Sequence, residues 1–215
     1  PMPTVAVVYH SEFGHTRVIA EAIARGASVI EGIDTRLISV SDLPVPSPDG
    51  SLTGTWNDLN SADAIVFGCP TYMGSVSAKF KVFMESSSAI WGTQGWKDKL
   101  AAGFTNAGGL SGDKVNCLID LALFAAQHSM IWVSQGLFYD ATGINRMGSW
   151  LGMQAQSPLN VGLHPRPPWQ RPNGSQGGRH RKPPSSWKQA MLPAQRSPGP
   201  SHRSPSCMFP GGRQT

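Results

Sequence analysis

The stretch Val5-Ala6-Val7-Val8-Tyr9-His10-Ser11-Glu12-Phe13-Gly14-His15-Thr16 decides the fold of this chain. Its first part, Val5 to Tyr9, is a β-branched apolar run that predicts a strand buried on both faces, as at the centre of a parallel sheet. Apolar residues at helical spacing follow Thr16, so a helix is expected to start there. The first N–H groups of such a helix can bind an anion together with the hydroxyls of Ser11 and Thr16.

The kind of anion is narrowed by the motifs that this loop lacks. It contains no Gly-x-x-x-x-Gly-Lys-Ser/Thr, which argues against a nucleoside triphosphate, and no Gly-x-Gly-x-x-Gly, which argues against a dinucleotide. A terminal monophosphate remains as the expected ligand. Ordinary helix capping by the same Ser, Gly and Thr residues is the alternative, and this stretch alone leaves both open.

Two further strands run into polar loops that contain glycine. Ala64 to Gly68 reads as a buried strand followed by Cys69-Pro70-Thr71-Tyr72-Met73-Gly74-Ser75, and Leu100 to Asn106 reads as a strand followed by a Gly-rich loop up to Lys114. In an open α/β sheet, ligands bind at the carboxyl ends of strands where the strand order reverses. The three loops are therefore predicted to form one binding site.

These motifs resemble the flavodoxin-like NAD(P)H:quinone oxidoreductases of the tryptophan-repressor-binding-protein (WrbA-like) family. The resemblance covers residues from about 4 to 157 and is most specific at Pro-Thr-Tyr-Met-Gly-Ser. It implies a three-layer α/β fold with a parallel five-stranded sheet in the order 2-1-3-4-5. The expected strands lie near residues 5–9, 34–40, 64–68, 99–106 and 130–135.

The resemblance also implies FMN as the cofactor and NAD(P)H as the co-substrate, with two electrons passed to a quinone. The family's phosphate loop corresponds to Ser11, Glu12, Phe13, Gly14, His15 and Thr16. Its flavin-ring loop corresponds to Pro70, Thr71, Tyr72, Met73 and Gly74. The loop at the pyrimidine edge of the ring corresponds to Asn106, Ala107, Gly108 and Gly109.

Two more residues follow from the resemblance. His128 matches the family histidine that approaches the flavin ring, and we expect it to act in catalysis; the alternative is a helix-terminal histidine that interacts with the helix dipole. Ser129 stands where the family usually has glycine. Trp91 is expected to contact the substrate, over a neighbouring subunit's active site, or else to be a buried aromatic anchor. Relatives of this kind assemble as homodimers or homotetramers, and the same is expected here.

Charge divides the chain near residue 157. Residues 1–157 hold all thirteen acidic residues and nine basic ones, whereas residues 158–215 hold nine basic residues, no acidic one and twelve of the eighteen prolines. The basic segment could be an arm for nucleic acid or a membrane surface, a solvated extension, or a stretch translated out of frame. We interpret it as disordered or non-native, so it gives no reason to expect a nucleic-acid partner. The family's last amphipathic helix is then absent, and the sheet should expose apolar surface.

The remaining signals exclude several classes of protein. Cys69, Cys117 and Cys207 are far apart and odd in number, which indicates reduced thiols; Cys69 is expected to pack rather than react. The six histidines show no zinc-site spacing, so no metal is predicted. No apolar run reaches the roughly 20 residues of a membrane span, and no signal peptide precedes the first strand, so a cytoplasmic protein is expected.

The alternatives to an enzyme are a flavodoxin-type electron carrier and an inactive binding protein.

Overall fold

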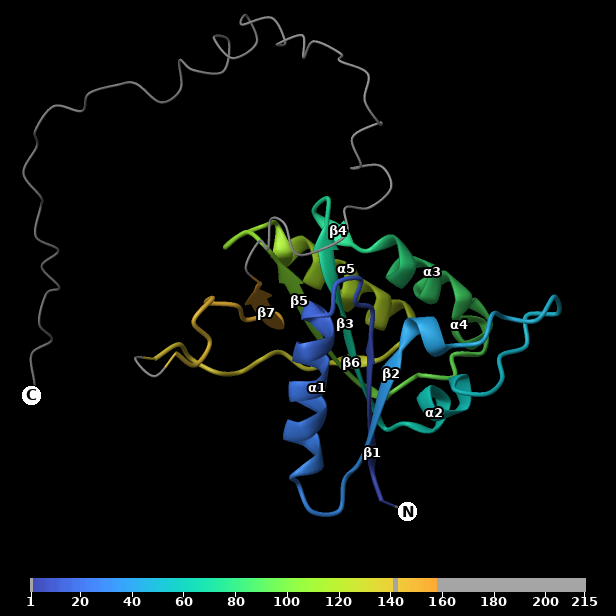
Figure 1. The fold of residues 1–215 in the computed structure, drawn as a ribbon. Coiled ribbons are helices and arrows are strands. Elements are labelled where there is room, and N and C mark those ends of the chain that lie inside the picture. The colour runs from blue at the N-terminus through green and yellow to red at the C-terminus, as the bar shows by residue number, and fades with distance from the viewer. Residues whose placement is uncertain (1, 141–142, 158–215) are drawn as a thin grey trace, which may run out of the picture. The chain divides into compact units, whose positions relative to one another are not determined.

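The computed structural model of the 215-residue chain describes residues 2–140 and 143–157. Its centre is a sheet with the order β2-β1-β3-β5-β6, in which all neighbouring strands are parallel (Figure 1). The predicted α/β class and strand order are thereby confirmed. These strands are β1 (Thr4–Tyr9), β2 (Asp34–Ser39), β3 (Ala64–Tyr72), β5 (Leu100–Ala107) and β6 (Ile131–Trp132). The basic segment 158–215 lies outside the described residues.

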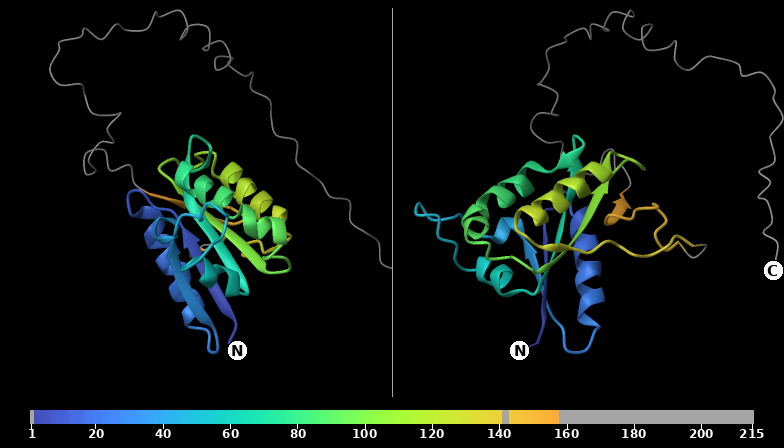
Figure 2. Two further views of the ribbon diagram at one scale, coloured as in Figure 1. Left: turned by 90° about the vertical axis from the view of Figure 1, so that its right-hand side faces the viewer. Right: turned by 180° about the vertical axis from the view of Figure 1, so that it is seen from behind.

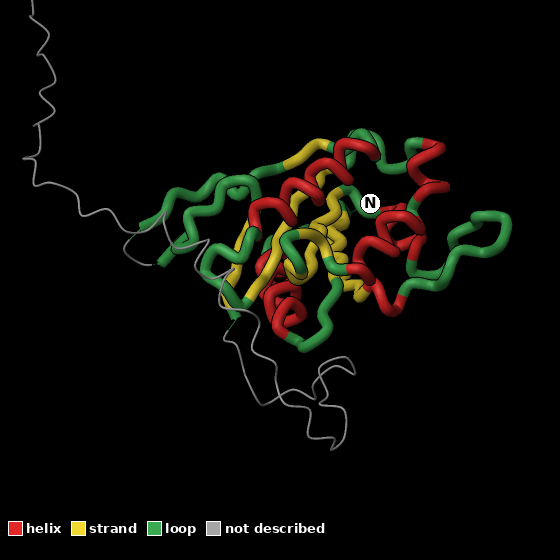
Figure 3. The backbone as a smooth tube through the Cα atoms, turned by 90° about the horizontal axis from the view of Figure 1, so that it is seen from above, coloured by secondary structure: helices red, strands yellow, loops and turns green. Residues whose placement is uncertain are grey.

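Helices cover both faces of the sheet, which makes three layers (Figures 1 and 2). One face carries α1 (His15–Ser28), and the other carries α2 (Trp56–Ser61), α3 (Ala78–Ser86), α4 (Ser88–Thr93) and α5 (Lys114–Gln127). Viewed from above, the strands lie between these layers (Figure 3). A short 3₁₀ helix, η1 (Val40–Asp42), follows β2. No helix in the described part of the chain is long and apolar enough to cross a membrane.

Alternation along the strands explains the two layers. Ala6 and Val8 of β1 belong to the larger core beneath α2 to α5, whereas Val7 and Tyr9 belong to the smaller core beneath α1. A strand that is apolar at every position can bury both faces, as this one does. The larger core is rich in aromatic rings; Phe67, for example, contacts Phe124 edge-on with 5.3 Å between ring centroids.

The fifth strand differs from the expected continuous strand over 130–135. β6 pairs only with the start of β5, and β7 (Met153–Gln156) pairs in parallel with its end, so residues 133–152 interrupt the strand. Trp132 connects the two sides of the break. The indole of Trp132 lies so close that a Cβ on Gly103 would be 2.6 Å from it, and the Trp132 Nε1–H donates to the Leu151 carbonyl at 2.9 Å.

Part of the sheet face on the α1 side is uncovered. Leu100 and Ile131 are register partners on this face, and they are 46% and 53% exposed. Val133, just beyond β6, is 45% exposed. In the described residues no helix follows α5. The apolar sheet surface expected in the absence of a last helix is therefore present.

The turn after α5 adopts the conformation that usually selects glycine. Ser129 has φ +56°, its N–H donates to the Ala126 carbonyl at 2.9 Å, and the Met130 N–H donates to the Ala125 carbonyl at 3.0 Å. This pair of bonds is a Schellman motif, in which a left-handed residue ends the helix. The serine thus forms a turn that usually selects glycine, at a cost of roughly 1 kcal/mol.

Candidate functional site

The three predicted loops meet at one edge of the sheet. Tyr9 at the end of β1 pairs with Gly68 of β3, and Pro70 farther along β3 pairs with Asn106 of β5. Because these strands are neighbours and parallel, the segments that leave their carboxyl ends lie side by side (Figure 1). The structure thus brings the residues predicted at 11–16, 70–74 and 106–109 together.

The loop after β1 has the properties of an anion site. Gly14 is the N-cap of α1 with φ +84°, and no side chain caps the helix. The Ser11 hydroxyl is buried and has no hydrogen-bond partner among the described residues, while Thr16 is 2% exposed. A Cβ on Gly14 would meet no atom within 4 Å, which leaves room for a ligand. Neither hydroxyl serves as the simple cap of the alternative interpretation, and a phosphate fits this set of donors.

The cations near this loop already have acidic partners. Arg17 Nε donates to Glu21 Oε1 at 2.8 Å, and Lys79 Nζ donates to Glu12 Oε2 at 2.8 Å. The hydrogen bond from Lys79 lowers the pKa of Glu12, so this carboxylate is ionised at neutral pH. An anion at the loop would therefore be bound mainly by hydroxyl and N–H groups rather than by free basic side chains.

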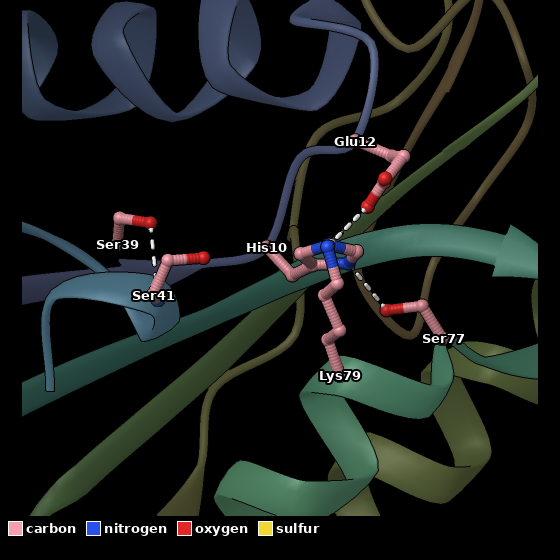
Figure 4. A network of polar contacts seen from close by, with 6 residues as sticks. All are labelled: His10, Glu12, Ser39, Ser41, Ser77 and Lys79. Atoms are coloured by element: carbon pink, nitrogen blue, oxygen red, sulfur yellow. Dashed lines mark hydrogen bonds and ion pairs between the residues drawn. The ribbon is translucent and has the colours of Figure 1, made fainter.

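His10 is a site residue that the sequence analysis missed. It is 3% exposed; its Nδ1 lies 2.7 Å from Ser77 Oγ and its Nε2 lies 3.3 Å from Glu12 Oε2 (Figure 4). Burial is the main reason that its pKa is lowered, so the ring is neutral at neutral pH. A neutral ring that donates from Nε2 to Glu12 accepts the Ser77 hydroxyl at Nδ1. His10 thereby ties the phosphate loop to Ser77, the N-cap of α3.

The ring loop is a tight hairpin. Met73 (φ +50°) and Gly74 (φ +80°) join β3 to the antiparallel β4 (Ser75–Val76), and the Met73 side chain is fully exposed. Two successive positive φ angles define the turn that favours Asn-Gly, so methionine at the first position is a strained choice. Polar groups of α5 hold this hairpin in place: Asn116 Nδ2 donates to the Gly74 carbonyl at 2.7 Å, and Ser75 Oγ donates to Asp120 Oδ2 at 2.5 Å.

The third loop is held by β7 and by Ser157, which directly follows it. Ser157 Oγ donates to Asn106 Oδ1 at 2.9 Å, and the Ser157 N–H donates to the Ala107 carbonyl at 3.1 Å. Gln156 Nε2 donates to the Gly108 carbonyl at 3.1 Å. The second half of the interrupted strand therefore positions the loop predicted at the pyrimidine edge.

Lys114 is a second residue whose role the sequence did not reveal. It is fully buried at the start of α5, where its Nζ donates to the Gly109 carbonyl at 2.7 Å and to the Leu110 carbonyl at 2.8 Å. Burial lowers its pKa. A lysine after a Gly-rich loop is normally exposed, so the pattern gave no signal for this inward orientation.

His128 and Trp91 lie elsewhere in the chain. His128 follows the last residue of α5, at the opposite end from Lys114, which is about 20 Å for a helix of this length. It is 1% exposed, its Nε2 lies 3.0 Å from Ser87 Oγ, and burial lowers its pKa to about 4. Trp91 is 49% exposed, and both residues line one groove between α3, α4 and α5. Within one chain neither residue belongs to the three predicted segments, although Ser75 and Val76 of the ring hairpin line the same groove.

Comparison with known proteins agrees with the α/β fold described above. The NADPH-dependent FMN reductase family matches residues 4–143. The chain belongs to this family. Among the described residues no group of three or more His, Cys, Asp or Glu side chains could hold a metal ion.

Individual relatives place the chain more closely. It is 39% identical over 166 residues to flavodoxin FldP of Pseudomonas aeruginosa, covering 74% of this chain and 84% of that protein. It is 30% identical over 158 residues to quinone-oxidoreductase QR2 of Triphysaria versicolor, covering 66% and 73%. The structure of a WrbA-like flavodoxin from Agrobacterium tumefaciens matches with a TM-score of 0.57 at 40% identity, covering 74% and 87%. This family member is WrbA-like and carries out FMN-dependent oxidoreduction with NAD(P)H as co-substrate.

Proposed function

We propose that this protein passes two electrons from NAD(P)H to a quinone at one bound FMN. The observation that carries the proposal is the buried, unpartnered Ser11 hydroxyl beside the uncapped start of α1, adjacent to two further loops. The name of the Triphysaria relative supports a quinone as the electron acceptor.

FMN supplies the two-electron chemistry, and the protein has to bind, orient and tune it. The Ser11 and Thr16 hydroxyls and the first N–H groups of α1 would bind the phosphate. Residues 70–74 would frame the ring, held by the side chains of α5. N–H groups of the segment 106–109 would donate to the pyrimidine edge and stabilise negative charge that develops there.

The kinetic test separates an enzyme from an electron carrier, the alternative that the name of the Pseudomonas relative favours. If one exposed flavin face serves both substrates in turn, initial rates with NAD(P)H and benzoquinone should give parallel double-reciprocal lines. Intersecting lines would contradict alternate use of one site. Absence of quinone-dependent NAD(P)H oxidation by protein that is loaded with FMN would favour the carrier.

Replacing Gly14 by valine is expected to weaken FMN binding about tenfold, because a β-branched residue is strained at φ +84° and its methyl groups would enter the space left for the phosphate. Isothermal calorimetry of the apoprotein with FMN measures this. Gly26→Val in the same helix is the control, since Gly26 has no positive φ and no atom within 4 Å of an added Cβ. Equal affinities of the two variants would remove Gly14 from the site.

A second copy of the chain would explain the positions of Trp91 and His128. Both line a groove that Ser75 and Val76 of the ring hairpin also line, and the Trp91 indole is half-exposed there. We propose that the protein is a homodimer or homotetramer in which this groove faces a neighbour's flavin. Trp91 would contact the substrate there. His128, which is buried in the same groove, would take part in catalysis.

The groove proposal is tested with two exposed apolar residues. Trp91→Ala should slow quinone reduction severalfold, whereas Val29→Ala should not, because Val29 is 82% exposed at the end of α1 opposite to the phosphate loop and lies outside the groove. Sedimentation of the FMN-loaded protein gives the oligomeric state. A monomer with full quinone activity would contradict the proposal.

A further inference from the structure

Two buried thiols touch directly beneath the ring loop. Cys69 is in β3, immediately before Pro70, and Cys117 is in the first turns of α5. Their Sγ atoms are 3.7 Å apart, both residues are 0% exposed, and neither is in a disulfide. The proposed electron transfer to quinone uses neither of them. This direct contact gives Cys69 a possible reaction partner, which the expectation that it only packs did not include.

The pair belongs to the larger hydrophobic core, and two buried hydroxyls lie beside it. Thr71 Oγ1 and Thr105 Oγ1 are 2.8 Å apart and buried, and Thr105 Oγ1 donates to the Cys69 carbonyl at 2.7 Å. The hydrogen bond with the Cys69 thiol is the largest influence on the pKa of Cys117 and lowers it. Burial of Cys117 acts in the opposite direction, and hydrogen bonds with the hydroxyls of Thr105 and Thr71 lower the pKa further, whereas burial raises the pKa of Cys69. Cys117 is thus the thiol that ionises first, and Cys69 keeps its proton.

We propose that Cys69 and Cys117 form a redox-active dithiol that peroxide oxidises to an intramolecular disulfide. The Cys117 thiolate attacks one peroxide oxygen, the O–O bond breaks, and the released hydroxide takes up the proton that Cys117 lost and becomes water. The Cys69 sulfur then attacks the Cys117 sulfenic acid, and the S–O bond breaks. The second hydroxide leaves with the Cys69 proton. Two thiols lose two electrons and peroxide becomes two water molecules.

The disulfide would act on the loops beside it. Its sulfur atoms must approach from 3.7 Å to about 2 Å, which draws the start of α5 toward the end of β3. The same helix holds the ring hairpin through Asn116 and the third loop through Lys114. Oxidation therefore moves two of the three loops. The resulting change in flavin affinity rests on the proposed function, whereas disulfide formation itself does not.

Peptide mapping tests the proposal on the full chain. The protein is treated with hydrogen peroxide, unfolded, alkylated with iodoacetamide and digested without reduction. We expect a peptide that links Cys69 to Cys117 and disappears after reduction. In Cys69→Ser treated with peroxide in the presence of dimedone, Cys117 should instead be recovered as the dimedone adduct of its sulfenic acid. In Cys117→Ser, Cys69 should be recovered alkylated by iodoacetamide. A wild-type digest in which Cys69 and Cys117 are both alkylated, or in which either is linked only to Cys207, would overturn the proposal.

FMN titration of reduced and peroxide-treated protein separates this inference from the cofactor assignment. We expect at least a threefold difference in the dissociation constant between the two forms, reversed by reductant. Equal constants for protein that carries the linked peptide would overturn the predicted effect on the loops. Failure of the reduced protein to bind FMN would contradict the proposed function, and the linked peptide would still be expected.

Discussion

Replacing Gly68 by alanine is expected to lower the free energy of unfolding by about 3 kcal/mol, because the added methyl group has no space. An added Cβ would lie 2.0, 2.2 and 2.4 Å from three carbons of the Phe104 ring. That ring is fully buried in the smaller core with Val7 and Ala20, so it cannot move into solvent. The Gly68 carbonyl also accepts the His10 N–H at 2.9 Å, so a displaced β3 should weaken FMN binding too.

Urea unfolding of matched variants measures this effect. Gly26→Ala, in the exposed part of α1 where no atom lies within 4 Å of an added Cβ, should raise stability by up to about 1 kcal/mol. The double variant Gly68→Ala/Phe104→Leu should lose at least about 1 kcal/mol less free energy of unfolding than the two single variants lose together. The smaller side chain at position 104 makes room for the methyl group. Additive effects would show that the Phe104 ring is not the obstacle.

The parallel arrangement of the strands followed from local patterns in the sequence, whereas the order of the strands came from the family resemblance. A strand that is apolar at every position, a polar loop and an amphipathic helix repeat along the chain, and this repeat imposes parallel crossovers. The interrupted fifth strand depends on contacts between distant residues. Trp132 covers Gly103 from a neighbouring strand, and Gly152 has room only for hydrogen, since a Cβ there would lie 2.4 Å from the Gly103 carbonyl oxygen. The hydrophobic periodicity of a sequence does not indicate such a close approach between two distant segments.

The grouping of the three predicted segments was predictable for a similar reason, since each lies at the carboxyl end of a strand. The predicted strand end at Gly68 was wrong, because β3 continues to Tyr72 and thus contains Pro70 and Thr71. His10 could have been found as well, because Ala6, Val8 and His10 alternate toward the same layer, and a histidine continuing that series must point inward. The burial of Lys114 and the Cys69–Cys117 contact could not have been found from the sequence. Their environment is made by side chains from β3, β5 and α5, which are far apart in sequence.

The stability of the protein should fall as the pH is lowered from about 6.5 to about 4, and His128 should be a main cause. Its ring packs against Trp96 and Phe124, with centroid distances of 4.5 and 4.8 Å, and its Nδ1 has no hydrogen-bond partner among the described residues. Burial alone lowers the pKa of His128 from 6.5 to about 4, and no charged group of the neighbouring helices contributes.

The direction of the change in stability with pH depends on how many protons the folded and the unfolded chain bind. Between these two pH values the unfolded chain binds a proton at His128 that the folded chain does not bind, so acid favours unfolding. One pKa unit corresponds to about 1.4 kcal/mol, which gives a loss of about 3 kcal/mol across the window and none above pH 7. Burial also lowers the pKa of His10, which adds a change in the same direction.

Urea unfolding at a series of pH values compares the wild type with His128→Gln. The variant should be less stable at pH 7.5, because glutamine does not replace the ring packing against Trp96, and its stability should depend less on pH between 6.5 and 4. The comparison of slopes cancels the contributions of His10 and of the carboxylates, which both proteins share. The ring of His128 in the folded wild type should titrate near pH 4 by NMR. Parallel stability curves, or a titration near 6.5, would show that the buried ring binds its proton as readily as an exposed one.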